Sequence, residues 1–444
     1  MKILFVSLGC DKNLVDSEVM LGLLYEAGYE ITDDEEAADA AVVNTCCFIN
    51  DAKEESINTI IELGERKKQG KLQAIVVTGC LAQRYEKEIS EQLPEVDAIV
   101  GTTAYEEIVH VLKETLEGEH PHRIKSIDYL PEKNYHRVMT TGGYYSYLKI
   151  AEGCNKNCSY CIIPKVRGRF RSVPMEHIIK TARELTEKGA AELILVAQET
   201  TLYGVDLYGE KKLPELLRRL CELPLLKWIR ILYCYPEEIT DELIQTIKTQ
   251  KKICHYLDLP IQHCSDTILK RMGRRTTKAE LMERIRRIRE EIPDIALRTS
   301  LITGFPGETE AEHEELKEFI RQMRFERLGV FTYSPEEGTK AAQMENQIDE
   351  ALKEKRREEL MLLQQEIIEQ RMEDYISVEC EVMIEGSLPE EENVYVGRTY
   401  MDAPNVDGYI FVKARAGLMS GDIVKVLITD AREYDLIGEL VPEE

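Results

Sequence analysis

The sequence predicts an α/β protein in three parts: an N-terminal open parallel α/β sheet domain (residues 1–120), a central partial (β/α)6 barrel (140–372) and a small C-terminal β-barrel (373–442). Strands alternate with helices through the first 120 residues, and a second alternation of six units follows. After one long charged helix, short alternating strands and turns take over. A length of 444 residues suits two or three domains.

The N-terminal part carries four apolar, β-branched runs separated by helical segments. The runs are KILFVSLGC, AAVVNTCC, AIVVTGC and DAIVG. Between them, SEVMLGLLYEAGY has helical spacing and Gly28 closes it. This alternation is typical of an open parallel sheet. Residues 118–143, which end in Gly142-Gly143, are expected to be a connector.

The central part carries six strand candidates, two fewer than a full eight-unit barrel. They are YSYLKIAEGC, ELILVAQET, WIRILYC, HYLDLPIQHC, IALRTSLITGF and RLGVFTYS. Their C-terminal ends are polar, and chemistry in such barrels collects at those ends. Gln198 and Gln262 are therefore candidate cofactor contacts, although polar capping of a strand end explains them equally well.

The C-terminal part begins after a charged helix that is expected over residues 348–376. The strand candidates beyond it are VECEVMIEG, NVYVGRTY, YIFVKAR, DIVKVLITDA and LIGELV. From residue 373 to the end there are 17 acidic and 5 basic residues, a net charge of 5 − 17 = −12. Such a surface opposes nucleic acid and attracts a basic protein, or it simply keeps the protein in solution.

The whole chain is acidic and rich in free thiols. It has 82 acidic and 57 basic residues, a formal charge of −25, which makes nucleic acid a poor default partner. Twelve cysteines in 444 residues are too few for a disulfide scaffold, and no apolar run approaches a membrane span. We expect a cytoplasmic protein with reduced thiols and clustered cysteines that bind metal.

Three cysteines crowd into the stretch EGCNKNCSYCIIP. Cys154, Cys158 and Cys161, here called the loop trio, are one ligand short of a closed zinc site. On a four-iron cluster, three thiolates leave one iron open to a small molecule. A zinc site completed by a distant histidine or cysteine is the alternative.

Three more cysteines each follow a strand of the N-terminal sheet. Cys10, Cys46 and Cys80, here called the strand-end trio, come after LG, NT and TG. Because parallel strands end at one edge of a sheet, the three thiols can meet. We expect a second cluster with an open iron. The alternative, cysteine as apolar filler, fits the other single cysteines better; these include Cys221, Cys234 and Cys380.

The cysteine loop, which follows a strand that opens a β/α barrel, resembles the radical S-adenosylmethionine (SAM) superfamily. SLGCDKNLVDSE, VVNTCCFI, VVTGCLAQRY and YLKIAEGCNKNCSYCIIPKVRGRFRS together resemble the methylthiotransferases, in the form typical of the ribosomal-protein branch, and the last segment resembles a TRAM domain. Asp11 stands where the family usually has proline, and Cys47 where it usually has glycine. We assign Cys46 rather than Cys47 to the cluster, because NTC keeps the family register.

The resemblance implies two 4Fe-4S clusters and two SAM molecules per turnover. One SAM gives its methyl group to a sulfur at the strand-end trio. The other is cleaved at the loop trio to an adenosyl radical, which takes the β-hydrogen of an aspartate in the twelfth small-subunit ribosomal protein. Flavodoxin or ferredoxin is implied as electron donor, together with a sulfur donor of unknown identity. Direct tRNA binding is not expected.

Three other functions remain open at this point. The same chemistry on a tRNA adenosine is the first, a non-catalytic iron–sulfur electron carrier is the second, and a zinc-binding interaction module is the third. Basic residues follow the cysteine loop: Lys165, Arg167, Arg169 and Arg171. They are either a solvated face or, by our hypothesis, include an arginine that pairs with the target carboxylate; Arg167 and Arg169 are the ones to test.

Overall fold

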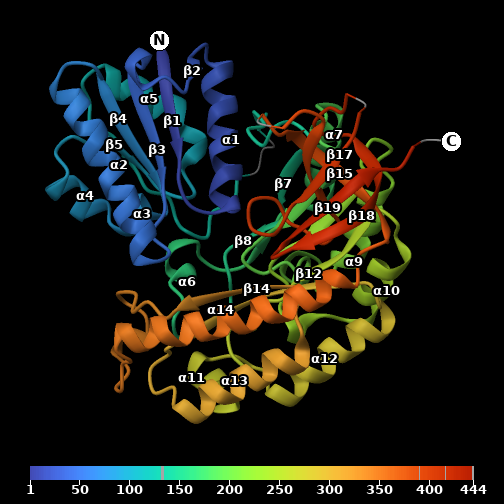
Figure 1. The fold of residues 1–444 in the computed structure, drawn as a ribbon. Helices are drawn as coiled ribbons and strands as arrows, with labels where there is room; N and C mark the ends of the chain where they lie inside the picture. Colours follow the sequence, from blue (N-terminus) through green and yellow to red (C-terminus); the bar gives the residue numbers. More distant parts are fainter. Residues whose placement is uncertain (132–134, 390, 416, 443–444) are drawn as a thin grey trace.

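The computed structural model describes residues 1–131, 135–389, 391–415 and 417–442. Figure 1 shows the predicted three-part architecture, with the N-terminal sheet at one side, the central sheet and its helices beside it, and the C-terminal barrel packed onto the central part. Within the described ranges, no helix combines the length and the apolar character that crossing a membrane requires.

The N-terminal domain is a six-stranded parallel sheet in the order β2-β1-β3-β4-β5-β6. Its strands are β1 (Lys2–Ser7), β2 (Glu30–Thr32), β3 (Ala40–Thr45), β4 (Ala74–Gly79), β5 (Ala98–Val100) and β6 (His122–Arg123). Its helices are α1 (Asp11–Glu26), α2 (Asn50–Lys68), α3 (Cys80–Arg84), α4 (Glu86–Gln92) and α5 (Ile108–Leu116). Strands β3 and β4 are buried along their whole length, as expected for β-branched runs covered on both faces.

The central domain is a six-stranded parallel sheet in the order β14-β13-β12-β11-β10-β7, so the partial barrel is confirmed. Its strands are β7 (Tyr145–Lys149), β10 (Glu192–Val196), β11 (Trp228–Ile231), β12 (Ile253–Asp258), β13 (Ala296–Thr303) and β14 (Arg327–Thr332). A small hairpin, β8 (Ala151–Glu152) with β9 (Arg171–Ser172), flanks the cysteine loop.

Helices cover one face of the central sheet. They are α7 (Met175–Glu187), α9 (Leu213–Cys221), α10 (Asp241–Thr249), α11 (Asp266–Met272), α12 (Lys278–Glu291), α13 (Glu310–Met323) and α14 (Glu350–Glu373). The short helix α6 (Ile163–Val166) instead packs against α3 of the N-terminal domain, and α8 (Val205–Tyr208) lies beside β9. Helices α12 and α13 each begin with a capping box, Thr277 with Glu280 and Thr309 with Glu312. The long helix α14 runs beside β14 and leads into the C-terminal barrel (Figure 1).

The C-terminal domain is a closed barrel in the order β15-β16-β17-β19-β18. Its strands are β15 (Glu379–Ser387), β16 (Val394–Thr399), β17 (Ile410–Lys413), β18 (Ile423–Arg432) and β19 (Asp435–Leu440).

The C-terminal barrel packs on the face of the central sheet opposite the helices. On β10, Leu193 and Leu195 face the helix-side core, whereas Ile194 and Val196 pack in a shared core with the barrel. Arg398 of the barrel donates to Glu192 of β10 at 2.8 Å, with both side chains fully buried. Because both of its faces are covered, β10 is buried at all five positions, and its one charged residue, Glu192, is paired with Arg230 and Arg398.

Candidate active site

The strand-end trio lies at one edge of the N-terminal sheet. Cys10 caps α1 after β1, Cys46 follows β3, and Cys80 begins α3 after β4. A Cβ placed on Gly9 would lie 3.0 Å from the Cys46 sulfur, so the two loops touch. Burial raises the pKa of the Cys80 thiol, and charge on Cys47, Cys10 and Cys46 adds to the rise. Three thiols from distant segments are thus within electrostatic reach of one another.

The Cys46–Cys47 doublet places its two side chains in different surroundings. The Cys46 sulfur faces the Gly9 loop. Cys47 is 1% exposed and packs in the apolar core with Leu81. Burial raises the pKa of Cys47 to about 11. Cys46 thus contacts the Cys10 loop, whereas Cys47 shares the apolar core with Cys80, so the assignment of Cys46 to the cluster stays a prediction.

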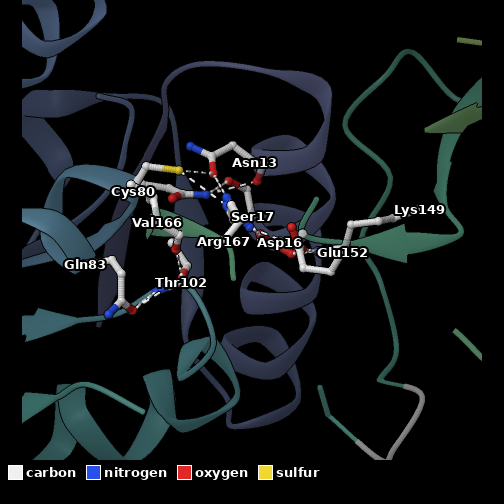
Figure 2. A network of polar contacts seen from close by, with 12 residues as sticks. Asn13, Asp16, Ser17, Cys80, Gln83, Thr102, Lys149, Glu152, Val166 and Arg167 are labelled. Atoms are coloured by element: carbon white, nitrogen blue, oxygen red, sulfur yellow. Dashed lines mark hydrogen bonds and ion pairs between the residues drawn. The ribbon is translucent and has the colours of Figure 1, made fainter. Parts of the chain in front are cut away.

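Arg167 joins the N-terminal domain to the cysteine loop (Figure 2). It is 2% exposed, and its Nη1 donates to Asp16 at 2.7 Å and to Glu152 at 3.3 Å. Its Nη2 donates to Asn13, and its Nε lies 3.4 Å from the Cys80 sulfur. The guanidinium therefore opposes the rise that burial causes in the pKa of Cys80. The Arg167 guanidinium is occupied by these internal partners and is not available to bind a substrate carboxylate. Arg169 is exposed, and its contact with the substrate carboxylate stays a prediction.

A second buried cation, Lys149 of β7, shares the same carboxylates. It donates to Asp16 and, at 2.8 Å, to Glu152. Burial alone would raise the pKa of Glu152, but the two cations hold it well below its usual value. Gln198 donates to Glu152 at 2.7 Å and accepts from the backbone N–H of Gly153 at 2.8 Å. Gln198 thus fixes the strand that leads into the cysteine loop.

The polar face of α1 is the part of this network that sequence reasoning missed. Asn13, Asp16, Ser17 and Glu18 are each 3% exposed or less. Glu18 accepts a hydrogen bond from Arg137, which lies outside the N-terminal sheet. The signal was present: polar residues at i, i+3 and i+4 form a stripe where a surface helix normally buries apolar ones.

The loop trio lies between β8 and α6. Gly153, just before it, has φ of 79°, and a Cβ there would lie 2.1 Å from the carbonyl oxygen of Arg169, so only glycine fits. Burial raises the pKa of Cys154 to about 11 and of Cys161 to about 12. Charge on Cys158 adds to both rises, as expected for thiols within electrostatic reach of one another.

Two buried charged groups beside the loop trio lack hydrogen-bond partners within the described part of the chain. They are the Oε2 of Glu199, after β10, and the whole guanidinium of Arg274. Burial raises the pKa of Glu199 to about 8. Arg274 stacks on Tyr235 at 4.3 Å and lies 3.6 Å from Glu237. A polar ligand carrying both charges would satisfy these groups.

The segment after β11 reaches both trios. The Lys12 ammonium lies 3.4 Å from the ring centroid of Tyr233, whose hydroxyl donates to Asp11, the neighbour of Cys10, at 3.0 Å. Two residues on, burial raises the pKa of Tyr235 and charge on Cys158 adds to the rise. The two cysteine trios therefore flank one short segment at the C-terminal end of the central sheet.

Gln262 follows β12 at the same edge. Its φ of 72° is unusual for a non-glycine residue, and its backbone N–H donates to Ser300 at 2.9 Å.

Across the described residues, no three His, Cys, Asp or Glu side chains converge closely enough to hold a single metal ion. A four-iron cluster binds each thiolate at a different iron.

Comparison with known proteins covers nearly all of the chain. Residues 2–101 match the uncharacterized protein family UPF0004, residues 148–320 the radical SAM superfamily and residues 377–441 the TRAM domain. The ribosomal protein uS12 methylthiotransferase RimO of Lachnoclostridium phytofermentans is 63% identical over 438 residues, 99% of each chain. RimO of Clostridioides difficile is 49% identical and covers 100% of this chain and 99% of its own.

Solved structures agree on the fold. The radical SAM methyltransferase TsrM of Kitasatospora setae, solved with tryptophan and a SAM analogue, has a TM-score of 0.53 at 14% identity and covers 74% of this chain and 72% of its own. Another TsrM structure, with cobalamin and a [4Fe-4S] cluster, also has a TM-score of 0.53 and covers 85% of this chain and 75% of its own. From the full-length identity and the matched radical SAM and TRAM segments, the chain belongs to the radical SAM methylthiotransferases, in the family of proteins named RimO.

Proposed function

We propose that this enzyme attaches a methylthio group to the β-carbon of an aspartate in ribosomal protein uS12. The observation that carries the proposal is the 63% identity, over 99% of both chains, to a protein named for that activity. The two cysteine trios that flank the segment after β11 support it, because the reaction needs a radical source and a sulfur site close together.

The residues present fit two 4Fe-4S clusters and SAM. Cys154, Cys158 and Cys161 would hold the cluster that binds SAM. The buried side chains of Glu199 and Arg274, whose Oε2 and guanidinium lack hydrogen bonds within the described residues, suit the amino and carboxylate groups of SAM. The second cluster would be held by Cys10, Cys46 and Cys80. When bound, the cluster and SAM supply a radical that removes a hydrogen too weakly acidic for a general base. The electron would come from flavodoxin or ferredoxin.

The chain's own residues would orient the two sites. Arg167 ties Cys80 to the strand before the loop trio through Glu152, so one buried guanidinium links the residues that would hold the two clusters. Gln198 fixes the same strand from β10. Gln262, at the edge of the sheet, is a further candidate for cofactor contact.

Charge favours a basic protein over tRNA as the substrate. In the C-terminal part, Asp402 and Asp407 are buried, and so is Arg398. Leaving these three out changes the net charge of that part from −12 to 4 − 15 = −11, so the surface remains strongly acidic. Such a surface would steer a basic ribosomal protein and repel an RNA backbone.

The proposed domain limits are 1–120, 140–372 and 373–442. The matched family segments 2–101, 148–320 and 377–441 lie inside them. Because the proposed substrate is a ribosomal protein, we place the enzyme in the cytoplasm.

Mass spectrometry of uS12 from cells with and without the gene tests the proposal. We expect a methylthio mass gain on one aspartate only when the gene is present, and none with a Cys158→Ala variant. A methylthio adenosine in tRNA that depends on the gene, with uS12 unmodified, would establish the tRNA alternative instead.

A further inference from the structure

A buried ion pair lies beside Cys10, where the N-terminal domain meets the central sheet. The Lys12 ammonium is 2.9 Å from the Oδ1 of Asp11, and both side chains are 8% exposed. The same Oδ1 accepts a hydrogen bond from the Tyr233 hydroxyl at 3.0 Å. The Oδ2 of Asp11 is buried and makes no hydrogen bond to any described residue. One carboxylate is thus held by an ammonium and a phenol, with its second oxygen unsatisfied.

Tyr233 is fixed in an uncommon conformation. Its φ is 60°, in the left-handed region that non-glycine residues rarely adopt. Its N–H donates to Asp258 at 3.0 Å, and its carbonyl accepts from the N–H of Thr200 at 3.1 Å. Such conformations persist where surrounding contacts hold them, and they concentrate at ligand sites. The ring is therefore pre-positioned under the Lys12 ammonium, 3.4 Å from its centroid.

The ion pair lies between the strand-end trio and the segment that reaches the loop trio, where the Lys156 ammonium is 5.0 Å from the ring centroid of Tyr235. Lys12 and Asp11 directly follow Cys10 of the strand-end trio. Tyr235, two residues after Tyr233, is beside the loop trio. A group bound to Lys12 and Tyr233 would lie next to Cys10 of the strand-end trio, in the segment that leads to Tyr235 beside the loop trio.

We propose that Lys12 and Tyr233 bind the carboxylate of the substrate aspartate, and that the Asp11 carboxylate occupies this site until the substrate displaces it. The inference rests on the proposed function and names the group that selects its substrate. Exchanging one carboxylate for another keeps the buried ammonium paired, so the large cost of an uncompensated buried charge is avoided. An asparagine side chain offers no charge and would not displace Asp11.

Peptide binding to the anaerobically reconstituted full-length protein tests the inference without turnover. The probes are a fluorescent uS12 peptide with its aspartate and the same peptide with asparagine, compared by anisotropy. Wild type should prefer the aspartate peptide by about 10- to 100-fold, the range of a buried charge-assisted hydrogen bond. Lys12→Gln should lower this preference to about twofold or less. Asp11→Asn should bind the aspartate peptide about three to ten times more tightly, because the internal competitor is gone.

Asp97→Asn is the matched control. Asp97 is also the carboxylate partner of a lysine, Lys67, but it precedes β5 and so lies at the opposite edge of the sheet from the cysteines. The Asp97→Asn variant should leave the preference for the aspartate peptide unchanged. Tyr233→Phe keeps the ring and removes the hydroxyl, so it should weaken binding of the aspartate peptide and leave binding of the asparagine peptide unchanged. It replaces Lys12→Gln as the test if that variant loses iron or does not fold.

The outcomes separate the inference from the proposed function. A folded, iron-loaded Lys12→Gln with the wild-type preference, or weaker binding of the aspartate peptide by Asp11→Asn, would overturn the inference. A wild type that prefers the aspartate peptide yet forms no methylthio product with reductant and SAM would instead count against the proposed function. Equal binding of both peptides by wild type would also overturn the inference.

Discussion

Replacing Arg167 with glutamine should destabilise the junction between the N-terminal domain and the cysteine loop. The guanidinium is 2% exposed and contacts Asp16 at 2.7 Å, Glu152 at 3.3 Å and the Cys80 sulfur at 3.4 Å. Its removal leaves two buried carboxylates with Lys149 as the cation that still contacts both.

The loss of unfolding free energy depends on the cation that remains, Lys149. Removing one member of a buried ion pair costs about 3–5 kcal/mol, because the other charge stays buried without compensation. Since Lys149 continues to neutralise part of the charge, we expect the lower end, about 3 kcal/mol. With a slope of about 3 kcal/mol per molar urea for a large chain, the midpoint should fall by about 1 M.

The assay is urea unfolding of the cluster-free protein, followed by circular dichroism. Arg169→Gln is the control, since Arg169 is exposed and its loss should change stability by no more than about 0.5 kcal/mol. Arg167→Gln should also retain less iron after reconstitution. An unchanged midpoint and iron content, together with a raised KM for uS12, would refute this reasoning and return Arg167 to the role of a substrate contact.

Three further predictions concern single side chains. Cys46→Ser should lose the iron of the strand-end trio and Cys47→Ser should keep it, as iron analysis will show. Glu199→Gln should weaken SAM binding about tenfold in equilibrium dialysis, because it removes a buried carboxyl group that can ionise against the amino group of SAM. Burial lowers the pKa of His263 to about 3 from 6.5, so the unfolded chain takes up its proton first as the pH falls below 6.5. Wild type should therefore lose about 2 kcal/mol by pH 5 through this group, and His263→Gln should show a correspondingly flatter pH dependence of stability.

The sequence pattern predicted the strands that are rich in buried apolar residues. The four apolar N-terminal runs are β1, β3, β4 and β5, and the six central and five C-terminal strands were also predicted. It missed β2, β6 and β9, which have three, two and two residues and no apolar pattern, because pairing with a neighbouring strand alone defines them.

The position of the strand-end trio at one edge of the sheet could be predicted from the sequence, and the contacts that support it could not. Strand ends of a parallel sheet share an edge, so the strand-end trio followed from topology. Asp11 and Tyr233 are 222 positions apart, and Asp16 and Arg167 are 151 apart, so no local pattern links them. The packing of the C-terminal barrel on the helix-free face of the central sheet could not be predicted either, because the charge count of a segment does not indicate which surface it packs against.

Iron and sulfide analysis of the anaerobically reconstituted enzyme tests the two-cluster arrangement most directly. We expect about eight irons per chain in wild type and about four in each of two variants, one with the loop trio and one with the strand-end trio changed to alanine. About four irons in wild type, with no loss when one trio is removed, would contradict the arrangement on which the proposed sulfur insertion depends.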